Sequence, residues 1–153
     1  QRAYDWFMVV RNPYTRCISE FVSDHWHLPG KAHANNSYFN NHISHHLDNV
    51  LLPTDSIVSG EHYTPASWYL QGLVPGVKVH VLRFENLTEE FNALMDEYHI
   101  SMRWGNVTDG IHESYRFGIQ NVSIELADKI KKAYKSDFGA FNYSIDIRDA
   151  VFH

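Results

Sequence analysis

A short apolar run that turns directly into the start of a helix occurs twice in this sequence, and it constrains the fold more than any other feature. The first run, Trp6 to Val10, is almost continuously apolar, which is typical of a strand buried on both faces. Asn12 and Pro13 follow and favour a helix start, because Asn is a good N-cap and Pro suits the first helical position. The apolar residues that come next recur at helical spacing, and they predict a helix to about His25: Cys17, Ile18, Phe21 and Val22.

The second unit begins with residues 77–84, whose alternating pattern predicts another strand. Residues 86–89, Asn-Leu-Thr-Glu, have the form of a capping box, and an amphipathic stripe of Phe91, Leu94, Met95 and Tyr98 follows. Two strand-then-helix units predict an α/β layer fold with a parallel sheet. In this sheet the strand ending at Arg11 should lie next to the strand ending near Phe84, with helices on its faces.

The remaining sequence predicts mainly helices and connections. Residues 27–53 are polar, with a short helix expected near Asn41 to Leu51. Ser123 should cap a further helix, and the aromatic tail over residues 137–144 should pack back on the core. We expect one domain over residues 1–153, incomplete at its N-terminus because two strands are few for such a sheet.

Composition narrows the range of partners. The 153 residues carry a net charge of −5, so the chain lacks the basic footprint of a nucleic-acid-binding protein. No apolar run has the length of about 20 residues that a membrane span needs. Cys17 is the single cysteine, so there is no internal disulfide framework. We therefore expect no nucleic acid among the partners and no membrane contact by this chain.

Arg11 stands where a ligand would bind in an α/β sheet, beyond the carboxyl end of a strand. It also precedes a helix N-terminus, whose N–H groups and dipole favour an anion. Ser19 comes six residues after Pro13, about 9 Å along a helix axis. A guanidinium and a hydroxyl so placed can close on one phosphate. Alternatively, Arg11 pairs with a surface carboxylate and Ser19 faces solvent.

The segment "RNPYTRCISEF", residues 11–21, resembles the 3′-phosphate-binding motif of sulfotransferases that use 3′-phosphoadenosine-5′-phosphosulfate (PAPS). Its form is similar to that of the Golgi-type carbohydrate sulfotransferases and their bacterial relatives. Three later segments resemble the same group in the same order: "HYTPASWYL" (62–70), "VLRFENLTEEFNAL" (81–94) and "IKKAYKSDFGAFNYS" (130–144).

The resemblance implies a P-loop-NTPase-like three-layer sandwich with a parallel sheet, and an enzyme that transfers a sulfonate group from PAPS to a hydroxyl or amine. It implies a carbohydrate acceptor, release of 3′,5′-ADP and no metal. The chemistry would be an in-line displacement, with a base taking the acceptor proton and cations stabilising the leaving phosphate.

The same resemblance suggests roles for individual residues of this chain. Arg11 and Ser19 would bind the 3′-phosphate, with Tyr14 and Arg16 in support, although these two could equally be structural. The segment "IHESY" (111–115) loosely matches an element that contacts the nucleotide, which makes His112 and Ser114 candidates. His62 is a candidate for catalysis or for the acceptor site.

The chain departs from the family at its N-terminal end. The phosphosulfate-binding loop of the family precedes the arginine motif, yet only ten residues precede Arg11. We therefore expect an N-terminally truncated fold that is inactive by itself. Two other functions stay open: a non-catalytic nucleotide-binding or interaction module of the same fold, and a metal-binding domain. The metal-binding alternative rests on three residues that would share a helix face, His42, His45 and His46.

Localisation depends on the origin of the chain, which would work in the Golgi lumen if eukaryotic and in the cytoplasm if bacterial. Five Asn-x-Ser/Thr sequons occur, at Asn35, Asn86, Asn106, Asn121 and Asn142, and they would be glycan acceptors in a secreted or luminal protein but carry no meaning in a bacterial one. Three further aromatic residues could stack on an adenine or a sugar, although we expect them in the core: Trp68, Tyr69 and Trp104.

Overall fold

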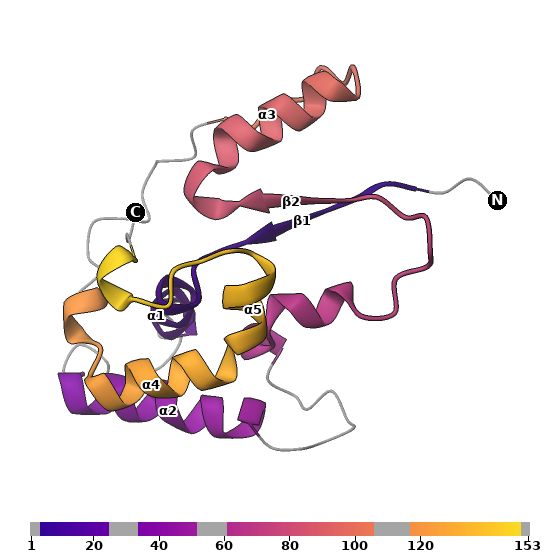
Figure 1. Cartoon of the computed structure of the whole chain (residues 1–153). Coiled ribbons are helices and arrows are strands. Elements are labelled where there is room, and N and C mark those ends of the chain that lie inside the picture. The colour runs from indigo at the N-terminus through magenta and orange to yellow at the C-terminus, as the bar shows by residue number, and fades with distance from the viewer. Residues whose placement is uncertain (1–3, 25–33, 52–60, 106–116, 151–153) are drawn as a thin grey trace. The chain divides into compact units, whose positions relative to one another are not determined.

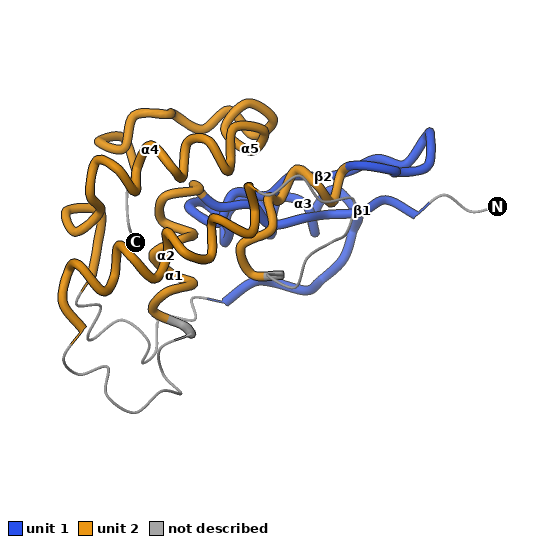
Figure 2. Tube along the Cα trace, turned by 90° about the horizontal axis from the view of Figure 1, so that it is seen from below, with its two compact units in different colours: residues 1–11, 71–114, 153 blue, residues 12–70, 115–152 orange. Residues whose placement is uncertain are grey.

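The computed structural model describes residues 4–24, 34–51, 61–105 and 117–150. The chain forms two compact units (Figure 2). Unit 1 comprises residues 1–11, 71–114 and 153, and unit 2 comprises residues 12–70 and 115–152. The assignment of residues 1–153 to one domain stays a prediction.

Unit 1 contains a two-stranded parallel sheet (Figure 1), formed by β1 (Trp6–Val10) and β2 (Val79–Arg83). The register runs from Trp6 opposite Val79 to Val10 opposite Arg83, so the predicted pairing of the two strands is confirmed. Helix α3 (Leu87–Glu97) packs on this sheet through a small apolar cluster, whose buried members are Leu82, Phe91, Leu94 and Met95. Three residues of the predicted stripe, Phe91, Leu94 and Met95, therefore form the buried face of α3, whereas Tyr98 lies just beyond the helix and is exposed.

Unit 2 is helical. Its main helices are α1 (Pro13–Asp24), α2 (Asn36–Leu51), α4 (Ile124–Ala133) and α5 (Lys135–Ala140), and its 3-10 turns are η3 (Glu61–Tyr63), η4 (Ala66–Leu70), η6 (Ile119–Asn121) and η7 (Ile147–Asp149). The predicted helix starts at Asn12 and Ser123 are confirmed. Asn12 Oδ1 accepts a hydrogen bond from the Tyr14 N–H at 3.0 Å, and Ser123 Oγ accepts one from the Leu126 N–H at 3.1 Å.

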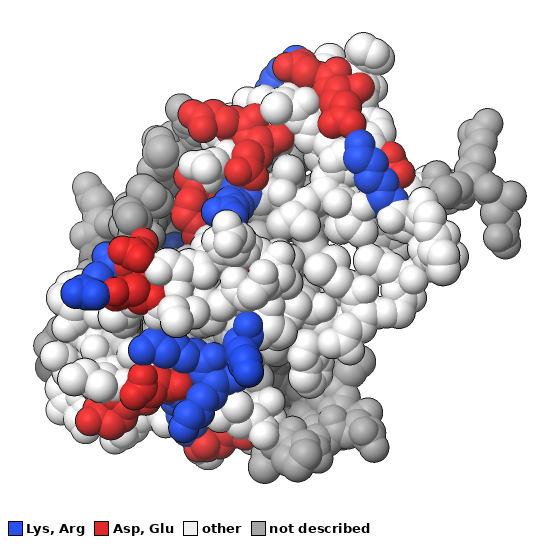
Figure 3. Space-filling view, viewed as in Figure 1, with Lys and Arg blue, Asp and Glu red and all other residues white. Residues whose placement is uncertain are grey.

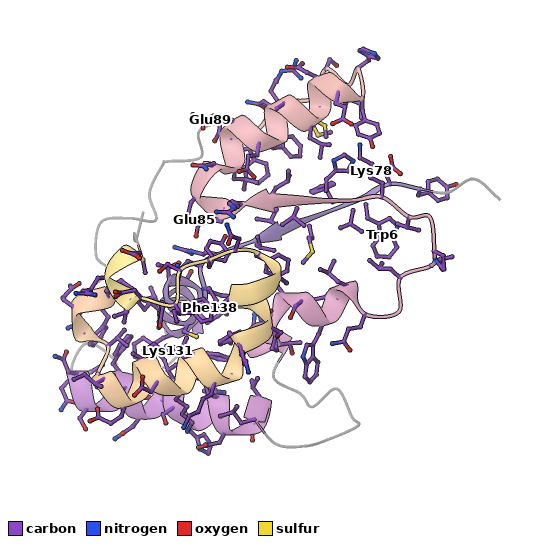
Figure 4. All side chains as sticks on the ribbon, in the orientation of Figure 1. Trp6, Lys78, Glu85, Glu89, Lys131 and Phe138 are labelled. Carbon is purple, nitrogen blue, oxygen red and sulfur yellow. The ribbon has the colours of Figure 1, made fainter. Side chains whose placement is uncertain are left out.

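Aromatic rings form the centre of unit 2. The Phe39 and Phe117 rings stack with centroids 4.8 Å apart, and the edge of Phe21 meets Phe39 at 4.9 Å. The Tyr14 ring lies 5.3 Å from that of Phe138, which points into this core (Figure 4). The prediction that the C-terminal aromatic segment packs on the core is therefore confirmed for Phe138.

Two local predictions need correction. The helix predicted near Asn41 to Leu51 is confirmed, but α2 begins earlier, at Asn36, because Asn35 Oδ1 caps it by accepting from the Tyr38 N–H at 2.9 Å. The capping box at residues 86–89 does not form, since Asn86 makes no side-chain cap bond. A 3-10 turn, η5 (Phe84–Asn86), instead leads straight into α3.

The architecture is thus mixed α/β and mostly helical, with a small parallel sheet, which agrees with the predicted class at this coarser level. Among the residues that the structure describes, no helix combines the length and apolar character that crossing a membrane requires.

Candidate functional site

The carboxyl ends of the two strands of unit 1 bring Arg11 and Phe84 together. Val10 and Arg83 are the last residues in register, so Arg11 and Phe84 are the first residues beyond the strands. The guanidinium carbon of Arg11 lies 4.3 Å from the centroid of the Phe84 ring, a cation–π contact. The side chain of Phe84 is 41% exposed, so this contact is accessible to solvent.

Glu90 anchors the turn that carries Phe84. Its carboxylate accepts a hydrogen bond from the backbone N–H of Arg83, where β2 ends. The N–H of Leu87 bonds to the carbonyl of Phe84 itself, which closes the turn. Glu85 and Glu89 lie near the same end of β2 in Figure 4, whereas Trp6 and Lys78 mark the end where the strands begin. Helix α3 thus fixes the position of Phe84 through the carboxylate of Glu90, a residue outside the predicted capping box.

On helix α1 of unit 2, Tyr14 has an internal partner. Its side chain is buried, and its hydroxyl donates a hydrogen bond to the carbonyl of Ile145 at 2.7 Å. Burial raises the pKa of Tyr14 to about 12, with smaller contributions from Asp128 and Asp146. Tyr14 therefore ties α1 to the C-terminal segment, which is the structural role that the sequence left open.

Arg16 also makes internal contacts. Its Nη2 donates to the backbone carbonyl of His62 at 2.9 Å, and its Nη1 lies 3.8 Å from Oδ2 of Asp137. Its guanidinium carbon lies 5.8 Å from the centroid of the Tyr134 ring. These contacts make Arg16 the link between α1, η3 and the α4–α5 segment.

Asp137 completes a buried polar network in unit 2. The residue is 3% exposed, and its two carboxylate oxygens accept from the backbone N–H groups of Ala66 and Ser67 at 2.8 and 2.9 Å. Tyr134, three residues earlier, donates from its hydroxyl to the carbonyl of Tyr63 at 2.7 Å. The segments around α1, residues 62–70 and residues 130–144 therefore converge on one set of hydrogen bonds.

Ser19 and His62 are more accessible. Ser19 is partly exposed on α1, and among the described residues no hydrogen bond or ion pair involves its side chain. The His62 side chain is 81% exposed, and its Nδ1 lies 3.3 Å from Oε2 of Glu20 on α1. Arg11 belongs to unit 1 and Ser19 to unit 2, so the structure describes each within its own unit. The candidates His112 and Ser114 lie outside the described residues.

The histidines of α2 take part in ring packing. His42 and His46 lie with ring centroids 4.6 Å apart, and His46 stacks on Tyr63 at 4.9 Å. His42, His45 and His46 all lie on α2, a longer helix than predicted, and the rings of His42 and His45 each lie near that of His46, as one shared helix face requires. In the four described ranges, no group of three His, Cys, Asp or Glu side chains is arranged to hold a metal ion.

The expectation that Trp68, Tyr69 and Trp104 pack in the core was wrong. Their side chains are 38%, 61% and 43% exposed. Trp68 and Tyr69 lie on the short turn η4, and Trp104 follows α3, where its ring meets only the edge of the cluster at Phe91, 5.7 Å away. Each of these rings is therefore available to a ligand within its own unit.

Charged side chains on helix α4 and the C-terminal segment of unit 2 tend to form pairs. Figure 3 shows Lys and Arg adjacent to Asp and Glu on the face viewed. Lys129 Nζ lies 2.5 Å from Asp48, and Lys131 Nζ lies 3.1 Å from Asp128. These carboxylate partners within unit 2 reduce the charge that the two lysines can offer to an anion.

The sequence did not single out Phe84, Glu90 or Asp137 as site residues. All three nevertheless lie within the segments that carry the family resemblance. For Asp137 the available signal was a carboxylate within the aromatic tail, because an Asp that becomes buried there needs hydrogen-bond partners.

No protein-family model, curated protein or solved structure matches this chain. Its function must therefore be inferred from its own residues.

Proposed function

We propose that this protein is a PAPS-dependent sulfotransferase, which transfers a sulfonate group from PAPS to a hydroxyl or amine of a carbohydrate acceptor. The observation that carries the proposal is the position of Arg11, one residue beyond a strand that pairs in parallel with β2. Ligands of α/β folds bind at the carboxyl ends of such strands. The finer fold proposed with this function is a P-loop-NTPase-like three-layer sandwich, of which β1 and β2 would be two strands.

In this proposal Arg11 and Ser19 bind the 3′-phosphate of the nucleotide. A guanidinium offers a planar fork of N–H donors that matches two phosphate oxygens, and a serine hydroxyl adds a further donor. Tyr14 and Arg16 support the site indirectly, because their internal hydrogen bonds hold the helix that carries Ser19. His112 and Ser114 remain candidates for further nucleotide contacts.

His62 is the proposed base that takes the acceptor proton. Its Nδ1 faces the Glu20 carboxylate at 3.3 Å, an arrangement in which Nδ1 carries the proton and Nε2 is the nitrogen that can accept one. The high exposure of its side chain leaves Nε2 accessible to an acceptor.

Titration calorimetry with 3′,5′-ADP tests the nucleotide site. Each hydrogen bond to the charged phosphate contributes about 1.5–3 kcal/mol, and association costs about 4–15 kcal/mol of lost freedom. We therefore expect millimolar binding, about −4 kcal/mol. The variant Arg11→Ala should lose the advantage of 3′,5′-ADP over 5′-AMP, which lacks the 3′-phosphate.

Arg103→Ala is the matched control, since Arg103 is an exposed arginine of the same unit that pairs with Asp96. This control should bind 3′,5′-ADP as the unchanged chain does. Equal heats for Arg11→Ala and the unchanged chain would exclude Arg11 as the phosphate ligand.

A further inference from the structure

Phe84 is a large aromatic residue, and packing in the core does not explain its position. It is not among the buried residues of unit 1, and its side chain is 41% exposed. Its backbone is nevertheless fixed from two directions, by the Leu87 N–H that bonds to its carbonyl and by the Glu90 carboxylate that bonds to the preceding N–H. A fixed backbone beneath an exposed ring indicates a role for the ring itself.

The ring lies against the guanidinium of Arg11. The separation of 4.3 Å between the guanidinium carbon and the ring centroid is well within the range of about 6 Å for a cation–π contact. Strand register explains why the two groups meet, because Arg11 and Phe84 are the residues that directly follow the last paired positions of parallel strands.

Stacking suits an arginine that binds an anion. A guanidinium that stacks its face on an aromatic ring directs its N–H donors outward in the plane of the group. A phosphate binds to that edge in a bidentate manner. The aromatic ring of Phe84 thus restricts the rotamers of Arg11.

We propose that Phe84 is a positioning residue that holds the Arg11 guanidinium ready for the 3′-phosphate, an inference that rests on the proposed function of Arg11. The aromatic ring is the required feature. Phe84→Leu should therefore weaken 3′,5′-ADP binding about two- to fivefold, the range expected for an exposed cation–π contact. Phe84→Tyr retains the aromatic face and should bind as the unchanged chain does. Binding of 5′-AMP should stay the same in all of these variants.

The experiment combines calorimetry with NMR of the Arg11 side chain, using the 153-residue chain. Without ligand, the Arg11 side-chain protons should show a ring-current shift to high field, which Phe84→Leu abolishes and Phe84→Tyr retains. In an Arg11→Ala background, Phe84→Leu should have no further effect on binding. Phe7→Leu is the matched control, because Phe7 is another half-exposed phenylalanine of unit 1 and contacts Phe91 instead.

The outcomes separate the two proposals. If Arg11→Ala leaves 3′,5′-ADP binding unchanged, or if the unchanged chain binds 3′,5′-ADP no better than 5′-AMP, the proposed function is overturned together with the positioning role. If Arg11→Ala abolishes the 3′-phosphate preference while Phe84→Leu binds normally, only the positioning role is overturned. A further loss on adding Phe84→Leu to Arg11→Ala would mean that the ring contacts the nucleotide directly, which also overturns it.

Discussion

Asp137 faces Arg16 with its Oδ2 3.8 Å from the guanidinium Nη1, while both carboxylate oxygens accept backbone N–H groups at the start of η4. The carboxylate therefore neutralises a cation of α1 and caps a turn at the same time. Arg16 in turn holds the carbonyl of His62. Through these contacts Asp137 helps to fix the position of the backbone that carries the candidate base His62.

The variant Asp137→Asn should lower the free energy of unfolding by about 2–4 kcal/mol, because one amide oxygen cannot replace two charged acceptors in a buried site. The side-chain NH₂ would also face an N–H donor of Ala66 or Ser67. Urea unfolding measures the change. Asp128→Asn is the control, since Asp128 forms an exposed ion pair with Lys131 and should change stability by less than about 0.5 kcal/mol. Equal losses in the two variants would contradict the assigned role.

Asn40 joins α2 to the start of α4, and its removal should also destabilise unit 2. Its amide donates to the carbonyls of Asn36 and Asn121 at 2.7 and 2.8 Å, and its Oδ1 accepts from the Ser123 N–H at 2.7 Å. Asn40→Ala should cost about 2–3 kcal/mol, because partly buried groups lose their partners.

The neighbouring residue Asn41 provides a matched control for this measurement. It is exposed and makes one long contact of 3.5 Å, to Ser37 Oγ, so Asn41→Ala should leave the free energy of unfolding nearly unchanged. Thermal or urea unfolding of both variants compares them directly. A loss at Asn41 as large as that at Asn40 would show that helix α2 is sensitive to substitution in general.

These contacts show what local rules can and cannot predict. The start of α1 follows from Asn12 and Pro13 alone, because a cap depends on residues two or three positions apart. The bonds of Asn40 and Asp137 join residues far apart in the chain, so no pattern in one segment contains them. Near Asn86 the local rule failed because the 3-10 turn η5 continues into α3, and Glu90 serves the strand end instead.

The same distinction applies to the candidate site. The position of Arg11 beyond β1 was predictable from one apolar run, and the pairing of β1 with β2 followed from the repeated strand-then-helix pattern. The contact between Arg11 and Phe84 was not, because it requires the exact register of the two strands. Tyr14 and Arg16 could not be assigned from sequence, since their partners lie in the C-terminal half of the chain or in η3.

Stability should fall at alkaline pH because of Cys17. Burial raises the pKa of its thiol from 9.0 to about 12, although its hydrogen bond with Tyr134 acts in the opposite direction. Above pH 9 the unfolded chain loses this proton while the folded chain keeps it, so stability is complete below pH 9 and is lost as pH rises towards 12. The slope for one group is at most about 1.4 kcal/mol per pH unit.

Urea unfolding of the unchanged chain and of Cys17→Ala at several pH values above and below 9 tests this prediction. The advantage of the unchanged chain over Cys17→Ala should shrink above pH 9, because alanine has no proton to lose. Parallel stability curves would show that Cys17 does not contribute. Between pH 8 and 9 the two curves should keep a constant separation.

Ser19→Ala should affect nucleotide binding without affecting stability. The hydroxyl is partly exposed and has no hydrogen-bond partner among the described residues, so its removal should change the free energy of unfolding by less than about 0.5 kcal/mol. If Ser19 binds the 3′-phosphate, the variant loses one hydrogen bond to a charged group, and 3′,5′-ADP should bind about tenfold more weakly. Calorimetry should show no change for 5′-AMP.

Ser101→Ala, at an exposed serine of unit 1, is the control. Unchanged 3′,5′-ADP binding by Ser19→Ala, with a clear loss in Arg11→Ala, would leave the arginine as a phosphate ligand and remove the serine.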